Sequence, residues 1–164
     1  MPSLTAEMAR ELLDYDQETG HFTWKVRTSF RVTKGARAGS KTHYGYVQIG
    51  IDGTKYKAHR IAWLITNGSW PSEHIDHLNG IRDDNRIANL REASRSINMQ
   101  NLLRPMEGNT SGFLGVCWDN EKQSFLAQIK TKGKNKFLGR FNDPAEAHQA
   151  YLTAKRQIHA GCTI

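Results

Sequence analysis

The chain has 164 residues, a formal net charge of +7 at pH 7 with its histidines neutral, and two cysteines. This length allows one medium domain or two small ones. The positive charge favours a polyanionic partner, of which nucleic acid is the commonest. No stretch approaches the about 18 consecutive apolar residues of a membrane span, and no signal-peptide core is present at the N-terminus. We therefore expect a cytoplasmic protein with no membrane partner.

The cysteines exclude two common ways of stabilising a small fold. Cys117 and Cys162 are far apart and form no Cys-x-x-Cys pair. The sequence therefore indicates neither a disulfide framework nor a structural zinc site, and we expect two reduced thiols.

The first segment, up to about residue 58, begins with a helix and continues with strands. Leu4, Met8 and Leu12 share one face at helical spacing, which predicts a helix over residues 5–13. Polar residues at 16–20 indicate a turn, and alternation over 21–26 predicts a strand.

A basic run over residues 27–41 follows and is expected to include a flexible loop. We expect it to contact phosphates, with a solvated surface run as the equally open alternative; its candidate contacts are Arg31, Lys34 and Arg37. Asp52-Gly53 then predicts a hairpin between strands at 44–49 and 54–57.

A short helix is expected from His59 to Ile65, ending near Asn67-Gly68. For His59 itself we favour a structural or DNA-contacting role over metal binding.

Residues 73–101 carry most of the functional signal. A strand around Ile75, a turn at Asn79-Gly80, a polar loop over 82–86 and a returning strand over 90–93 predict an antiparallel finger. Ser94 can cap a helix over 95–101. This arrangement would bring Asp76 and His77 to a strand end facing a helix that carries Asn98.

The ordered residues Asp76-His77, Asn79-Gly80, Asp84-Asn85-Arg86, Asn89-Leu90 and Asn98 resemble the HNH endonuclease motif. The similarity is to the ββα-metal type in its phage and intron-associated branch, where many relatives have histidine at the position of Asn98. The resemblance implies that His77 is the general base and that Asp76 and Asn98 hold one Mg²⁺ or Mn²⁺ per active site. It also implies that Asn89 braces the loop, and Arg86 is a candidate contact to phosphate.

The third segment follows a linker predicted at residues 104–108. Strands are expected over 112–118, 124–130 and 135–141. Asp143 and Pro144 then predict the start of a helix whose apolar face packs on a three-stranded sheet.

Residues 109–160 resemble the apetala-type (ethylene-response-factor) DNA-binding domain. The similarity rests on Gly-Val-x-Trp, Phe-x-Ala-x-Ile, Leu-Gly-x-Phe and Pro-x-Glu-Ala-x-x-Ala-Tyr. It implies a sheet laid in the DNA major groove. Cys117 replaces a base-reading arginine of that family, which implies limited sequence discrimination. The candidate DNA contacts of this segment are Gln128, Lys130, Lys132, Lys134, Lys136, Phe137 and Arg140.

Together these features predict an α+β protein: a ββα-metal nuclease finger with an N-terminal helix and strand-rich region, and a C-terminal three-stranded antiparallel sheet packed on one helix. The predicted domains are an HNH domain at 1–103, with an N-terminal part at 1–58 and the finger at 73–101, and an apetala-type domain at 109–164.

The predicted function is metal-dependent cleavage of double-stranded DNA by an enzyme of phage or homing type, which would act in the cytoplasm of a bacterial host. One active site would cut one strand, so a monomer would nick, and a double-strand break would need a homodimer. Both states stay open. Two alternatives remain: a DNA-binding regulator on an inactive HNH frame, and a nuclease acting on RNA or structured nucleic acid.

Overall fold

The computed structural model describes residues 4–30, 32–105, 107–159 and 161–163, and divides into two compact units, Met1–Arg95 and Ser96–Ile164. The elements up to residue 95 are α1 (Ala6–Leu12), β1 (Leu13–Tyr15), β2 (Phe22–Trp24), β3 (Ser40–Lys41), β4 (Val47–Ile51), β5 (Thr54–Lys57), α2 (Ala58–Asn67), β6 (His74–His77), the 3-10 helix η1 (Ile87–Asn89) and β7 (Leu90–Ala93). Then follow α3 (Arg95–Gln100), β8 (Val116–Asp119), β9 (Ser124–Thr131), β10 (Lys134–Phe141) and α4 (Pro144–Ile158). Small antiparallel sheets and helices confirm the predicted α+β class.

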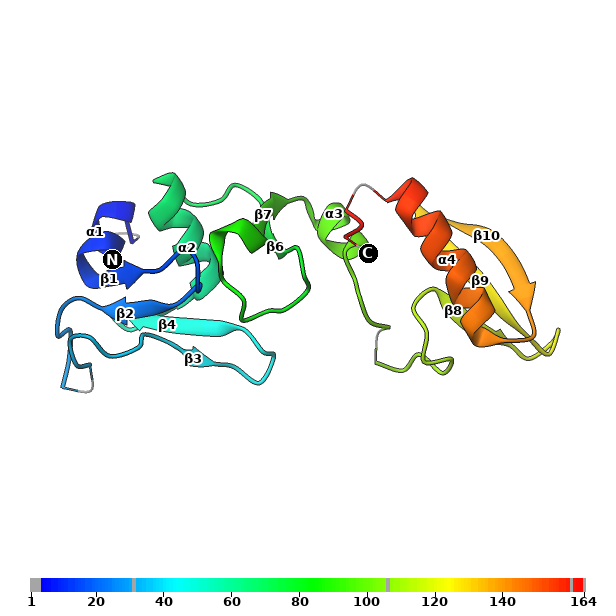
Figure 1. Cartoon of the computed structure of the whole chain (residues 1–164), viewed down its shortest axis with the longest axis horizontal. Helices are drawn as coiled ribbons and strands as arrows, with labels where there is room; N and C mark the ends of the chain where they lie inside the picture. The colour runs from blue at the N-terminus through cyan, green and yellow to red at the C-terminus, as the bar shows by residue number, and fades with distance from the viewer. Residues whose placement is uncertain (1–3, 31, 106, 160, 164) are drawn as a thin grey trace. The chain divides into compact units, whose positions relative to one another are not determined.

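The first unit is built around α1 and α2, which pack against each other (Figure 1). The Thr5 hydroxyl accepts a hydrogen bond from the Met8 N–H at 3.2 Å and so caps α1. Gly68, at φ 78°, ends α2 in the left-handed conformation that glycine adopts without strain. Both predicted helices are confirmed, and their apolar faces form one core with Leu13 and Ile49.

The β4–β5 hairpin is confirmed at its predicted turn. Asp52 and Gly53 have φ of 49° and 76°, the positive values that a two-residue hairpin turn requires. The hairpin leads directly into α2, so it fixes the point at which that helix begins.

The structure differs from the sequence-based expectation at the end of the first helix and in the basic run at 27–41. The first helix ends at Leu12 because Leu13 starts β1, which pairs with β2. Backbone hydrogen bonds to β2 hold the second half of the basic run at 27–41. The Gly35 N–H donates to the Trp24 carbonyl, and the Ala38 N–H donates to the Phe22 carbonyl. The side chain of Ala38 is buried, which also holds this part of the run against the core.

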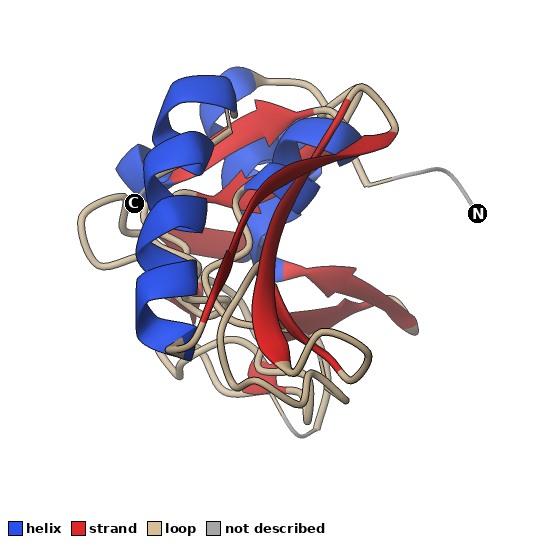
Figure 2. Cartoon of the chain, turned by 90° about the vertical axis from the view of Figure 1, so that its right-hand side faces the viewer, coloured by secondary structure: helices blue, strands red, loops and turns tan. Residues whose placement is uncertain are grey.

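The second unit contains the predicted three-stranded antiparallel sheet, in the order β10-β9-β8, with α4 along one face (Figure 2). Asp143 caps α4 as predicted, because its carboxylate accepts the Ala145 N–H at 2.9 Å. Ala127 and Ile129 point toward the helix and are buried there. The predicted linker and domain limits stay predictions; the two compact units divide within α3.

Candidate active site

The β6–β7 hairpin holds the Asp-His pair. Asp76 lies opposite Arg91 and His77 opposite Leu90 in the antiparallel register. The Gly80 N–H donates to the His77 carbonyl, which closes the predicted turn directly after the strand. The predicted strand, turn, returning strand and following helix are therefore all present. Asp76 and His77 are each only 5% exposed, so both side chains are buried in the first unit.

Asp76 is anchored by an arginine across the hairpin. The Arg91 guanidinium donates to one carboxylate oxygen of Asp76 from Nε at 3.0 Å and from a terminal nitrogen at 2.8 Å. A carboxylate has about four acceptor sites, so two donors at one oxygen leave it able to accept further bonds. Arg91 therefore orients the carboxylate and compensates its charge.

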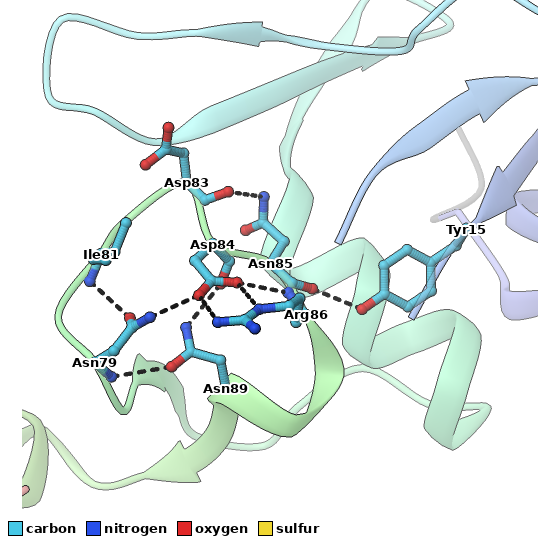
Figure 3. A network of polar contacts seen from close by, with 8 residues as sticks. All are labelled: Tyr15, Asn79, Ile81, Asp83, Asp84, Asn85, Arg86 and Asn89. Atoms are coloured by element: carbon cyan, nitrogen blue, oxygen red, sulfur yellow. Dashed lines mark hydrogen bonds and ion pairs between the residues drawn. The ribbon is translucent and has the colours of Figure 1, made fainter. Parts of the chain in front are cut away.

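The loop between the two strands is closed by amide side chains (Figure 3). The Asn89 amide oxygen accepts the Asn79 N–H at 3.0 Å, while its amide nitrogen donates to the Asp84 carbonyl at 2.9 Å. The Asn79 amide nitrogen in turn donates to the Asp84 carboxylate at 2.6 Å. Asn89 thus connects both sides of the loop that follows His77.

Arg86 lies in this loop and is bonded to Asp84, at 2.8 Å from Nε and 2.6 Å from a terminal nitrogen. These hydrogen bonds are the main cause that lowers the pKa of Asp84 to about 2. Arg86 neutralises a carboxylate of the loop, and its predicted contact with phosphate stays a prediction.

His77 is one of three aromatic rings that meet beside the hairpin. Its ring centroid lies 5.0 Å from that of His59, edge to face, and 6.0 Å from that of Tyr46. Tyr46 and His59 complete the triangle at 5.5 Å. Burial lowers the pKa of His77, against the opposing effects of the adjacent Asn85 side chain and nearby carboxylates including Asp76. His77 is consequently neutral at neutral pH, which is the form that can accept a proton.

Asn85 was not identified as a site residue from the sequence. It is 2% exposed, and its carbonyl accepts the Tyr15 hydroxyl at 2.7 Å (Figure 3). A Cβ at Gly20 would approach the Asn85 carbonyl carbon to 2.6 Å, so only glycine allows the 16–20 turn to lie this close. The polar Asp-Asn-Arg run predicts a loop, and no local pattern indicates that its asparagine is buried beside a histidine.

The remaining predicted site residues lie elsewhere. Asn98 is on α3 and belongs to the second unit, so its place beside Asp76 stays a prediction. Lys34 and Arg37 are exposed in the first unit, while Arg31 lies outside the described residues.

The candidate contacts of the second unit lie on β9 and β10 or the turn between them. Phe137 pairs with Gln128, and the Arg140 guanidinium carbon lies 5.5 Å from the centre of the Phe137 ring. Phe137 is 56% exposed, on the sheet face opposite the buried residues Ala127 and Ile129. The lysines at 130, 132, 134 and 136 follow the same hairpin. By the strand register Lys130 shares the face of Gln128 and Phe137, whereas Lys136 pairs with Ile129 and stands on the other face. The DNA contacts of this hairpin and the apetala-type resemblance stay predictions.

Comparison with known proteins agrees with the geometry of the finger. Residues 56–100 match the family model described as HNH endonuclease. Protein 3.8 of Escherichia phage T7 is 31% identical over 108 residues, which cover 63% of this chain and 88% of that protein. No solved structure matches the chain. Among the residues that the structure describes, no helix has the length and apolar character of a membrane span. The chain therefore belongs to the family of Protein 3.8 and carries an HNH endonuclease domain, which indicates a nuclease.

Proposed function

We propose that the protein is a metal-dependent DNA endonuclease of phage or homing type that nicks one strand per active site. The observation that carries this proposal is the state of His77, a buried and uncharged imidazole next to Asp76 within the HNH-matched segment. A general base must be unprotonated at the working pH and held within reach of the water that it activates.

His77 would accept the proton of the water that attacks the phosphodiester. The Asn85 amide beside the ring and the packing of His59 limit the orientations that the imidazole can take. Asn89 would act as a positioning residue, because its two hydrogen bonds fix the loop that follows His77. Proton acceptance by His77 requires the neutral imidazole, and the positioning role of Asn89 does not depend on the charge of the histidine.

The donor chemistry suits a hard divalent cation. Within the described residues, no three histidine, cysteine, aspartate or glutamate side chains gather at one point, so a cage made only of such ligands is not offered there. Mg²⁺ is commonly held by one or two carboxylates together with substrate phosphate. Asp76 and Asn98 are the residues that would hold the ion, with nucleic-acid phosphate completing the set. When bound, the ion would stabilise negative charge developing on the phosphate and the leaving oxygen.

The second unit would provide affinity rather than chemistry. The lysines of the β9–β10 hairpin would contact backbone phosphates, and the exposed ring of Phe137 would contact a base or a sugar. Point charges of this kind favour binding with limited discrimination between sequences.

The test is conversion of supercoiled plasmid to open circle in the presence of Mg²⁺, Mn²⁺ or EDTA. His77→Ala should abolish conversion, whereas His74→Ala, at an exposed position of the same strand, should keep it. Equal activity of both variants would refute the role of His77. Metal-dependent cleavage of RNA but not of duplex DNA would show that the substrate is RNA. Binding without cleavage in any metal would favour a DNA-binding regulator on an inactive HNH frame.

A further inference from the structure

Two cations lie against the ring of Tyr46, the same ring that neighbours His77. The Lys57 ammonium lies 4.7 Å from the Tyr46 ring centre, and the Arg82 guanidinium carbon lies 5.2 Å from it. These distances are within the range of cation–π contacts. Both cations and the imidazole of His77 thus neighbour the same ring, since the His77 centroid is 6.0 Å from that of Tyr46.

Among the residues that the structure describes, neither cation is paired with an acidic group. Across the described residues, the ion pairs of this region join Lys41 to Asp83 and Arg86 to Asp84, and none involves Lys57 or Arg82. The loop carboxylates are therefore engaged elsewhere. Because both distances are measured to the same ring centre, the two positive charges lie within about 10 Å of each other and repel. An anion that binds both would relieve their mutual repulsion.

Hydrogen bonds and secondary structure fix the Arg82 guanidinium and the main chain of Lys57. The Thr42 N–H donates to the Tyr46 carbonyl at 2.7 Å, and this turn positions the ring. One Arg82 nitrogen donates to the Tyr44 carbonyl at 2.9 Å, which uses one of its five N–H donors and leaves a fork for an oxyanion. Lys57 is the last residue of β5 and is followed at once by α2, so its main chain is fixed on both sides.

We propose that Lys57 and Arg82, held on the ring of Tyr46, form a binding site for one backbone phosphate of a nucleic-acid strand. The bound phosphate would neighbour the phosphodiester served by His77; this second part rests on the proposed function. Arginine supplies paired donors and lysine a point charge, a combination suited to the oxygens of a phosphodiester. The site would set the register of the strand relative to the base.

The test is the salt dependence of binding, measured in EDTA so that cleavage does not interfere. The probe is a fluorescently labelled duplex of mixed sequence, titrated with the full chain at several NaCl concentrations. Neutralising one phosphate contributes about 0.9 to the slope of log K against log salt. The pair Lys57→Gln and Arg82→Gln should lower the slope by about this amount, and weaken binding about eightfold at about 0.1 M salt.

A matched control separates a site from general electrostatics. Lys25→Gln with Lys55→Gln removes the same two charges from exposed positions of the first unit, and should leave most of the slope intact. Tyr46→Leu keeps both cations but removes their platform, and should lower the slope in part. Thermal unfolding of every variant excludes misfolding as the cause.

The phosphate site would be overturned if the two double variants had equal slopes, or if the slope of the Lys57→Gln and Arg82→Gln variant equalled that of the wild type. The outcome is independent of catalysis. A wild-type chain that cuts no substrate, while the slope falls as expected, would leave the phosphate site standing and refute the nuclease proposal. If the wild-type chain nicks DNA but the Lys57→Gln and Arg82→Gln variant has an unchanged slope, the nuclease proposal stands and the phosphate site is refuted.

Discussion

His59 should make the first unit sensitive to acid. Its side chain is 4% exposed, and its Nδ1 is buried without a hydrogen-bond partner in the part of the chain that the structure describes. Burial, together with the positive charge that His77 carries when protonated and the charges of Lys57 and Arg60, lowers the pKa of His59 from 6.5 to about 3. The folded protein therefore excludes a proton that the unfolded chain binds.

The size of the effect follows from proton linkage. Above pH 6.5 neither state is protonated at His59 and its contribution to stability is complete. As the pH falls below that value, only the unfolded chain gains the proton, and stability is lost until the folded pKa is reached. At about pH 5 the loss is about 2 kcal/mol. A folded pKa one unit higher would change this figure by less than about 0.1 kcal/mol, so the expectation depends mainly on the histidine being buried.

The measurement is urea unfolding at about pH 7.5 and about pH 5, followed by tryptophan fluorescence, since Trp24, Trp63 and Trp70 all lie in the first unit. His59→Gln cannot titrate, so the difference in unfolding free energy between the two pH values should shrink by about 2 kcal/mol. Any loss of stability from the substitution itself cancels in that difference. His21→Gln, at an exposed position, is the control and should keep the wild-type difference. The same difference in His59→Gln as in the wild type would refute the linkage.

Three further substitutions test individual contacts. Asn89→Ala removes two hydrogen bonds from the loop and should cost about 2–4 kcal/mol in urea unfolding while slowing nicking; a loss under about 0.5 kcal/mol would contradict its bracing role. Gly115→Ala places a Cβ 2.0 Å from the Tyr151 ring at φ 77° and should destabilise the second unit by on the order of 3 kcal/mol, seen as a lower Tm. Arg91→Met should cost on the order of 3 kcal/mol by removing the ion pair of the buried Asp76 carboxylate, and adding Asp76→Leu should recover part of that loss in the same unfolding assay.

The parts of the fold that the sequence predicts are those with local causes. Asp52-Gly53 can form the positive-φ turn of a hairpin, and Asp143 followed by proline both caps and starts a helix. Alternating apolar residues likewise predict the sheet of the second unit. Each of these signals acts within a few residues, so no knowledge of the tertiary fold is needed.

The candidate site depends on contacts that no local pattern contains. Tyr46 lies 31 positions before His77 in the sequence, yet their rings lie 6.0 Å apart. The partner of Asp76 follows from strand register, since Arg91 stands directly opposite, and register depends on how the intervening loop closes. Arg86 shows the same dependence: the sequence makes it a candidate contact to phosphate, which stays a prediction, and its ion pair with Asp84 is seen only in the fold.

The charges around His77 are arranged so that they favour both a neutral imidazole, as the proposed base requires, and the approach of an anionic substrate. Acidic groups near an imidazole favour its protonated form, and would also repel nucleic acid. Arg91, Arg86 and Lys41 pair with Asp76, Asp84 and Asp83, so the three aspartates of the finger carry little uncompensated charge. Burial can then keep the imidazole neutral. Lys57 and Arg82 remain as the uncompensated charges at the adjacent ring, where they attract a phosphate without displacing a carboxylate.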